Sequence, residues 1–285
     1  MEHLIDTRNL ETEKINQILE KTEELKKRDK KTLKGKEAAM LFYKSSTRTR
    51  ISFEIAIRKL GGNLTFLSKQ QSQLGRGETV EDTIRVLSRY NDLAIFRVHE
   101  HKDLVKMKKE SDIPIINALS DLLHPCQALS DLYTIKEKKG KPSEQKIVFL
   151  GDGSSNVCHS LINIAGKTDM KMNVSCPEKH EPEIDGKYKI ERDPEEAVEN
   201  ADVLYTDTWI SMGEKDKNID SFKPYQVNQE LLNKSKEDSI VMHCLPAHRE
   251  QELTSKVMDG DQSVIFDQAE NRLHVQKALL NMMNI

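Results

Sequence analysis

Short apolar runs that alternate with helical patterns are the feature of this sequence that most limits its possible folds. In the first half the apolar runs, which we interpret as buried strands, lie at 38–43, 63–67, 93–98 and 113–117. Helical patterns lie at 11–31, 48–60, 80–89 and 102–110. In the second half the strand candidates lie at 146–150, 172–176, 187–190, 203–206 and 240–243. Strands that alternate with helices are typical of parallel sheets with crossover helices, so the pattern predicts an α/β fold.

Length and one loop predict where the chain divides into domains. Its 285 residues suit two domains better than one. A longer helical pattern at 128–137 leads into the loop 138–145, which is rich in Lys, Gly and Pro. We therefore expect a first domain at 1–137 and a second at 138–268. The last helical pattern, near 271–282, comes too late to belong clearly to either domain.

Charge and cysteine content exclude several classes of protein. The chain has 44 basic and 47 acidic residues, a net charge of −3, which does not fit a strongly basic nucleic-acid binder or an acidic tail protein. Its four cysteines are widely spaced and form no CxxC pair, so we expect reduced thiols and neither a zinc site nor a disulfide scaffold. No apolar stretch approaches the roughly 20 residues that span a bilayer, and no apolar signal segment begins the chain. We therefore expect a soluble, cytoplasmic protein that binds neither membranes nor nucleic acid.

The segment 42–50, FYKSSTRTR, lies between a predicted strand and a predicted helix. The first N–H groups of a helix have no internal partner, and the helix dipole favours negative charge there. Ser46, Thr47 and Thr49 add hydroxyl donors, and Arg48 adds a planar fork that matches phosphate oxygens. The segment therefore predicts an anion site. The alternative is a well-capped helix that carries surface arginines.

Two further clusters of polar residues follow predicted strands, and a third motif partly resembles a nucleotide-binding loop. His124 and Gln127 lie where a strand leads into a helix, and together they could polarise a carbonyl, although a lone histidine there is usually structural. The segment 243–249, HCLPAHR, sets a thiol beside imidazoles, which suggests a nucleophile or a metal site. Metal binding needs three or four ligands at suitable spacing, so we predict no metal. The segment 151–156, GDGSSN, lacks the third glycine of a dinucleotide loop, and we do not expect nucleotide binding.

Eight motifs, in order along nearly the whole chain, carry a resemblance to a known family. They are SSTRTR at 45–50, QSQLGRGET at 71–79, FRVHEH at 96–101, LLHPCQALSDL at 122–132, GDGSSNVCHSL at 151–161, DTWISMGE at 207–214, HCLPAHR at 243–249 and FDQAENRLHVQKALL at 266–280. Together they resemble the aspartate/ornithine carbamoyltransferases, and DTWISMG with HCLPAHR resembles the ornithine branch. The aspartate branch would carry a lysine near 71–88, where this chain has none.

The resemblance implies two parallel-sheet α/β domains, one for carbamoyl phosphate and one for ornithine. The last segment, 269–285, would pack back on the first domain, and three chains would form a trimer. The reaction would move the carbamoyl group of carbamoyl phosphate to the side-chain amine of L-ornithine, giving L-citrulline and phosphate, in arginine biosynthesis or in the catabolic direction. No metal or organic cofactor is implied. The alternatives are a carbamoyltransferase for another amine, such as putrescine, and a non-catalytic anion-binding relative.

The same resemblance implies roles for particular residues. The group that would hold carbamoyl phosphate comprises Ser46, Thr47, Arg48, Thr49, Gln73 from a neighbouring subunit, Arg97, His124, Gln127, Cys244, Leu245 and Arg272. The group that would hold ornithine comprises Asn156, with Ser155 as the near alternative, Asp207, Ser211 and Met212. The catalytic residues would be Arg97, His124, Asp207 and Cys244. We expect Asp207 to orient the α-amine and Cys244 to contact the side-chain amine, and we reject Cys244 as a covalent nucleophile.

The chain departs from the family in one segment. The sequence 176–187, CPEKHEPEIDGK, leaves about ten residues between two strand candidates, too few for a comfortable crossover helix. The departure concerns one helix that would cover the second sheet and no residue of the expected site.

Overall fold

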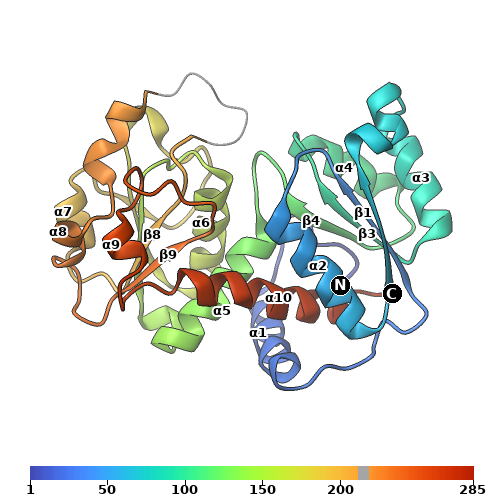
Figure 1. Cartoon of the computed structure of the whole chain (residues 1–285), viewed down its shortest axis with the longest axis horizontal. Coiled ribbons are helices and arrows are strands. Elements are labelled where there is room, and N and C mark those ends of the chain that lie inside the picture. Colours follow the sequence, from blue (N-terminus) through green and yellow to red (C-terminus); the bar gives the residue numbers. More distant parts are fainter. Residues whose placement is uncertain (211–217) are drawn as a thin grey trace. The chain divides into compact units, whose positions relative to one another are not determined.

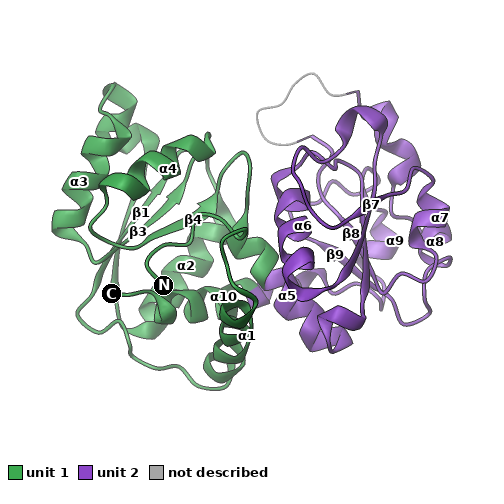
Figure 2. Cartoon of the chain, turned by 180° about the vertical axis from the view of Figure 1, so that it is seen from behind, with its two compact units in different colours: residues 1–129, 272–285 green, residues 130–271 purple. Residues whose placement is uncertain are grey.

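The computed structural model describes residues 1–210 and 218–285. The chain divides into two compact units (Figure 2). Unit 1 comprises residues 1–129 and 272–285, and unit 2 comprises residues 130–271. In the described part of the chain, no helix is both long and apolar enough to cross a membrane.

Unit 1 contains a four-stranded parallel sheet in the order β2-β1-β3-β4. Figure 1 labels β1, β3 and β4 of this sheet. Its strands are β1 (Glu37–Phe42), β2 (Asn63–Ser68), β3 (Leu93–Arg97) and β4 (Ile115–Leu119). Its helices are α1 (Thr12–Lys27), α2 (Thr47–Leu60), α3 (Val80–Tyr90) and α4 (His101–Glu110). Every residue of β3 is buried, as expected for an inner strand covered on both faces. The alternating pattern of the sequence therefore predicted this unit correctly.

One face of this sheet packs against α3 and α4. Leu41, Phe96 and Ile115 form a buried cluster with Ile84 of α3 and Leu104 of α4. The segment 71–79 lies before α3 and contains the short 3₁₀ helix η2 (Gln73–Arg76), which follows another, η1 (Lys69–Gln71). It is therefore locally ordered turn structure rather than an open loop.

Unit 2 contains a five-stranded parallel sheet in the order β7-β6-β5-β8-β9. Its strands are β5 (Lys146–Leu150), β6 (Lys171–Ser175), β7 (Lys189–Ile190), β8 (Val203–Thr206) and β9 (Ile240–His243). Its helices are α6 (Asn156–Thr168), α7 (Pro194–Val198), α8 (Gln229–Leu232) and α9 (Ser255–Met258), with the 3₁₀ helices η3 (Pro142–Glu144), η4 (Glu178–His180) and η5 (Ile219–Tyr225). Ile147 and Phe149 of β5 face a core with α6, whereas Val148 faces a core with α7, α8 and α9. This alternation is what a strand covered on both faces requires.

The short segment between β6 and β7 contains the 3₁₀ helix η4 and no α-helix. Ile184 and Tyr188 instead pack against the core formed with α6. A Cβ atom on Gly186 would lie 2.2 Å from a methyl carbon of Ile162, so the backbone itself rests on α6. The segment thus covers the sheet by close backbone contact, which explains how the unit tolerates the missing helix.

Two helices contain the points at which the units divide. These are α5 (Pro125–Lys139), divided after Leu129, and α10 (Ile265–Met282), divided after Asn271. The structure starts α10 at Ile265, six residues before the expected start near 271, because Ile265 already belongs to the core of unit 2. Residues 272–285 belong to unit 1, where buried Lys277 donates to the carbonyl of Leu25 at 2.6 Å and pairs with Asp29 at 2.7 Å. The expected return of the last helix to the first unit is therefore confirmed.

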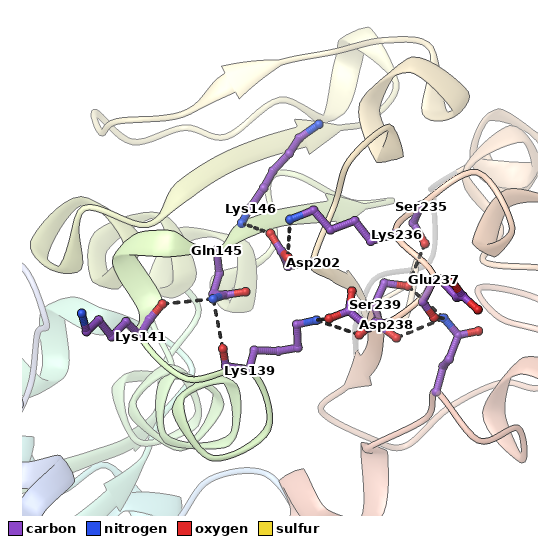
Figure 3. Close-up of polar contacts among 11 residues, drawn as sticks. Lys139, Lys141, Gln145, Lys146, Asp202, Ser235, Lys236, Glu237, Asp238 and Ser239 are labelled. Carbon is purple, nitrogen blue, oxygen red and sulfur yellow. Dashed lines mark hydrogen bonds and ion pairs between the residues drawn. The ribbon is translucent and has the colours of Figure 1, made fainter.

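Polar side chains at the amino ends of the unit 2 strands stabilise local structure (Figure 3). Asp202, before β8, accepts from the backbone N–H of Lys146 at 2.8 Å and pairs with Lys236 at 2.6 Å. The ammonium of Lys139 reaches both the carbonyl and the carboxylate of Asp238, at 2.7 and 2.6 Å. These charges satisfy one another, whereas the candidate site residues lie at the opposite, carboxyl ends of the strands.

Candidate active site

The start of α2 provides the features of an anion site in unit 1. Ser46 caps the helix and accepts from the N–H of Thr49 at 3.3 Å, and no acidic residue lies in the first turn. Arg48 is half-buried, and its buried Nε has no hydrogen-bond partner among the described residues. A half-buried guanidinium at a positive helix end favours an anionic ligand.

A cavity of about 700 Å³ lies beside this helix start. Its polar lining includes Lys44, Ser45, Ser46, Thr47 and Arg50. The guanidinium of Arg50 lies 3.7 Å from the centre of the Phe66 ring, so this cation is held in the cavity wall. The cavity opens onto hydroxyl groups and positive charge together with the carboxylate of Glu54, whereas Arg48 is not among its lining residues.

Buried donors gather at the carboxyl edge of the same sheet. Arg97 is the last residue of β3, and His124 and Gln127 flank the start of α5; their exposed fractions are 9%, 4% and 1%. The guanidinium of Arg272 donates to the hydroxyl of buried Thr49 at 2.6 Å. The sequence predicted these residues separately, and the structure places all of them within unit 1.

His124 is kept neutral by its surroundings. Its pKa lies well below the usual value of 6.5, first because the ring is buried and then because Arg272 and Arg97 repel a proton. A neutral imidazole offers one N–H donor and one acceptor, which suits it to polarise a carbonyl rather than to pair with phosphate as a cation.

This low pKa predicts how stability depends on pH. The unfolded state binds a proton at His124 below about pH 6.5, whereas the folded state resists it, so folding should weaken as pH falls from 6.5. The slope attributable to one such group is at most about 1.4 kcal/mol per pH unit. Urea unfolding at pH 7.5, 6.5 and 5.5 should show a smaller loss of stability for His124→Gln than for the wild type. Equal losses of stability in the variant and the wild type would contradict the lowered pKa of His124.

Gln73 is exposed at the start of η2. A side chain in this position is available to a second molecule. Its expected role in a neighbouring subunit stays a prediction.

Asp207 and Cys244 form a pair in unit 2. They follow β8 and β9, and the thiol of Cys244 donates to Asp207 Oδ1 at 3.0 Å. The same oxygen accepts from the N–H of Thr208 at 2.8 Å. Burial raises the pKa of Asp207, although nearby His243, the thiol and this N–H oppose the shift. A buried carboxylate with a thiol beside it favours a cationic amine as ligand.

The turn after β9 is fixed by two residues that sequence reasoning did not assign to the site, His243 and Glu252. The His243 ring donates from Nε2 to Glu252 Oε1 at 3.1 Å and accepts at Nδ1 from the N–H of Leu245 at 2.8 Å. Leu245 has a φ of 61° and precedes a cis proline. Nothing in the sequence marks Glu252, because its partner lies nine residues earlier and the contact exists only in the folded turn.

A metal ion in this turn would have to displace a hydrogen bond that the structure makes. The ligand atoms of Asp207, His243 and Cys244 lie within 4.8 Å of one another. However, Nδ1 of His243 already accepts a hydrogen bond and Nε2 carries the proton that it donates to Glu252. The imidazole therefore offers the Nδ1 lone pair to a metal only if the contact with the Leu245 N–H breaks.

The start of α6 distinguishes the two residues proposed for one role. Ser155 caps the helix and its hydroxyl accepts from the N–H of Cys158 at 3.2 Å. Asn156 is the first helical residue and is half-exposed. The geometry favours Asn156 as the ligand contact, since the Ser155 side chain serves the helix.

The glycine loop after β5 is filled by aromatic side chains. A Cβ atom on Gly151, whose φ is 119°, would lie 3.1 Å from the indole of Trp209. Trp209 stacks on Phe222 with their ring centres 5.8 Å apart, and the ring centres of Phe222 and His180 lie 4.6 Å apart. This stack packs against the backbone at the start of the loop. Ser211 and Met212 lie outside the described residues.

The chemistry is thus divided between two α/β units. One offers hydroxyls, guanidiniums and a neutral imidazole to an anion. The other offers a buried acid and a thiol to an amine. The class that the fold and these groups indicate is an α/β protein with a candidate anion site in one unit and a candidate amine site in the other.

Comparison with known proteins identifies the family. The family described as "Aspartate/ornithine carbamoyltransferase, carbamoyl-P binding domain" matches residues 2–137, and "Aspartate/ornithine carbamoyltransferase, Asp/Orn binding domain" matches residues 143–283. The chain therefore belongs to the aspartate/ornithine carbamoyltransferase family.

Several relatives are similar over nearly their whole length. The ornithine carbamoyltransferase of Staphylothermus marinus is 52% identical over 88% of this chain and 85% of its own length. That of Archaeoglobus fulgidus is 48% identical over 98% of this chain and 96% of its own length. The solved ornithine carbamoyltransferase of Pyrococcus furiosus, 44% identical, superimposes with a TM-score of 0.94 over 99% of this chain and 96% of that one.

Proposed function

We propose that this chain transfers the carbamoyl group of carbamoyl phosphate to the side-chain amine of L-ornithine, giving L-citrulline and phosphate. The main support is full-length similarity to ornithine carbamoyltransferases together with the paired acid and thiol of Asp207 and Cys244. A diamine such as putrescine has no α-carboxylate, so the contacts proposed for Ser211 and Met212 would have nothing to hold. A non-catalytic role would leave both the acid–thiol pair and the buried donors around His124 without a purpose.

In the first half of the reaction, the residues of unit 1 bind and polarise carbamoyl phosphate. Ser46, Thr47, Arg48 and Thr49 hold the phosphate at the helix start. Arg97, His124 and Gln127 hold the carbamoyl group, with Arg272 beside Thr49. Charge develops on the carbonyl oxygen and then on the leaving phosphate, so donors fixed in advance stabilise the transition state more than the ground state.

In the second half, an amine must attack as its neutral form. An alkyl ammonium has a pKa near 10.4, so the neutral amine costs about 4–5 kcal/mol at pH 7. Asp207 orients the α-ammonium, with Asn156, Ser211 and Met212 as further contacts, while Cys244 contacts the side-chain amine and Leu245 lies beside it. The alignment of two substrates supplies much of the rate, and no covalent intermediate on Cys244 is formed.

The proposal predicts which acceptors will react. With carbamoyl phosphate fixed, ornithine should give a carbamoylated product at a kcat/KM at least about 100-fold above putrescine, N-acetylornithine or aspartate, because only ornithine carries both the α-amino-acid group and the free side-chain amine. A colorimetric citrulline assay, with mass spectrometry for the other products, measures this. Preference for putrescine would support the alternative acceptor, and no turnover of any acceptor would support the non-catalytic relative.

We also propose a cytoplasmic homotrimer, or a multiple of trimers, whose sites are shared. Each site would combine Arg48 of one chain with Gln73 of its neighbour. The exposed position of Gln73 supports this arrangement. A closed ring of three has three equivalent interfaces, so each chain can both give and receive one loop.

Mixed trimers test the shared site. Arg48→Ala and Gln73→Ala should each be nearly inactive as pure proteins. When the two are unfolded and refolded together, some interfaces pair an intact Arg48 with an intact Gln73, and activity should return. Analytical ultracentrifugation and tagged chains check that mixed trimers form. Mixed trimers without recovered activity would show that the loop serves its own chain.

A further inference from the structure

A buried polar cluster in unit 2 lies close to the candidate active site without belonging to it. It comprises Asp131 of α5, Tyr205 of β8 and Gln268 of α10, whose exposed fractions are 0%, 0% and 1%. The Tyr205 hydroxyl donates to Asp131 Oδ2 at 3.0 Å. The side-chain amide of Gln268 donates from Nε2 to Asp131 Oδ1 at 2.7 Å and also lies 3.1 Å from the Tyr205 oxygen. Such a cluster is costly to bury unless its hydrogen bonds are made, and these are.

Asp131 determines which way the Gln268 amide faces. An ionised carboxylate only accepts hydrogen bonds, so it requires the NH₂ end of the amide and not the oxygen. The carbonyl end, Oε1, must then face the other way, and it accepts from the backbone N–H of His243 at 2.9 Å. Burial and Asp131 raise the pKa of Tyr205 well above its usual value, so its hydroxyl keeps the proton that it donates.

The N–H of His243 needs such an acceptor because of its place in the sheet. β9 stands at the end of the strand order, with β8 as its only strand neighbour in the described chain. Its Val241 N–H is satisfied by the carbonyl of Gln262 at 2.8 Å. Two residues later the N–H of His243 is satisfied by the Gln268 side chain. Gln268 therefore fixes the last residue of the strand before the chain turns.

The acid–thiol pair lies directly beyond this fixed strand end. Cys244 is the next residue in sequence, and its thiol lies 3.0 Å from Asp207 Oδ1. The thiol position depends on where the His243 backbone is held, since the two residues are adjacent in the chain. The Glu252 contact holds the His243 ring, whereas Gln268 holds its main chain.

We propose that Gln268, oriented by Asp131, is a positioning residue that places the Cys244 thiol against Asp207 and thereby sets the rate of carbamoyl transfer. The inference rests on the proposed function for its catalytic readout only. Its structural readout is the reactivity of the Cys244 thiol, which can be measured without any carbamoyl-accepting substrate.

The first test is Gln268→Met, which keeps the side-chain volume and removes the three hydrogen bonds of the Gln268 side chain, to Asp131, Tyr205 and His243. We expect kcat to fall at least 10-fold while the Kd for carbamoyl phosphate stays within about threefold, because all the residues proposed to hold that substrate except Cys244 and Leu245 lie in unit 1. Tyr205→Phe is the matched control, since it removes one hydroxyl from the same cluster and leaves the contact between Gln268 and His243. Its kcat should stay within about threefold of the wild type.

The alkylation rate of Cys244 distinguishes positioning of the thiol from a merely structural role of Gln268, which would leave this rate unchanged. Cys244 is half-exposed, whereas Cys126, Cys158 and Cys176 are buried, so iodoacetamide should report on Cys244. A thiol that moves away from a carboxylate ionises more readily, so Gln268→Met should raise the alkylation rate at pH 7.5 several-fold and shift its pH profile to lower pH. A folded Gln268→Met with wild-type kcat and wild-type alkylation would overturn the proposal.

A charge swap keeps the proposal testable if Gln268→Met fails to fold. Gln268→Glu places the new carboxylate against that of Asp131, and the activity should fall at least 10-fold. Asp131→Asn with Gln268→Glu restores one donor, one carboxylate and an acceptor for the His243 N–H. This double variant should recover most of the activity and the wild-type alkylation profile. Recovery of folding without recovery of either readout would show a structural role only and would overturn the inference. If ornithine proves the wrong acceptor but alkylation follows these expectations, the proposed function fails and the positioning role stands.

Discussion

Arg48→Ala is expected to lower kcat/KM for carbamoyl phosphate by about 10²–10³, the range found when one preorganised donor to a developing oxyanion is removed. The half-buried guanidinium stands at the start of α2, where no acidic side chain competes for it in the first turn. Its loss removes a charge-assisted fork to a dianion, and the hydroxyls, the N–H groups and the cations Lys44 and Arg50 of the cavity wall remain. Steady-state kinetics with carbamoyl phosphate varied, at saturating ornithine, measures the effect.

Arg58→Ala is the matched control for this substitution. Arg58 lies on the same helix, its side chain is 67% exposed, and it pairs with Glu54 at 2.8 Å. Loss of an exposed pair of this kind changes stability by less than about 1 kcal/mol and should leave kinetics unchanged. If Arg48→Ala turns over carbamoyl phosphate within a few-fold of the wild type, the anion site is not at this helix start.

Asp207→Asn should weaken the binding of ornithine by about 30–150-fold and the binding of carbamoyl phosphate by less than about threefold. The substitution keeps the shape of the side chain and removes the charge proposed to pair with the α-ammonium, and an unpaired ammonium in a desolvated site costs about 2–3 kcal/mol or more. Trp209, the only tryptophan of the chain, is buried two residues away. Its fluorescence offers a direct titration of ornithine binding alongside the KM.

Asp238→Asn controls for the loss of one carboxylate from unit 2. Asp238 is exposed and pairs with Lys139 at the amino ends of the strands. Its removal should leave ornithine affinity as it is in the wild type. Unchanged ornithine affinity in Asp207→Asn, by contrast, would place recognition of the α-ammonium on another residue.

Much of the fold could be predicted from the sequence because its signals are local. The bounds of β5, β8 and β9 agree residue for residue with the apolar runs at 146–150, 203–206 and 240–243. The largest error was at α10, expected near 271 but starting at Ile265. Its first residue, Ile265, is buried in the core of unit 2, whereas residues near its end are buried in unit 1, so no single amphipathic stripe marks where it begins.

The sequence alone determined which groups could do chemistry. A capping Ser46 followed by Arg48 after an apolar run specifies a helix start suited to an anion, since caps and dipoles act within one turn. The clusters around His124 and Cys244 likewise indicated donors and a thiol through residue type, whereas Asp207 was indicated by the resemblance to the carbamoyltransferases. Such features can be recognised in the sequence because their physical basis spans only a few residues.

Only the tertiary structure decided how those groups are held. Arg272 meets Thr49 across 223 residues, and Gln268 meets Asp131 across 137. Neither contact can be predicted from a sequence period or spacing, because each forms only when separate elements pack in one core. The direction in which the Gln268 amide faces, and the neutral state of His124, result from burial and from charges supplied by distant segments. Residue type limits the chemistry that is possible here, and packing fixes the geometry in which that chemistry can occur.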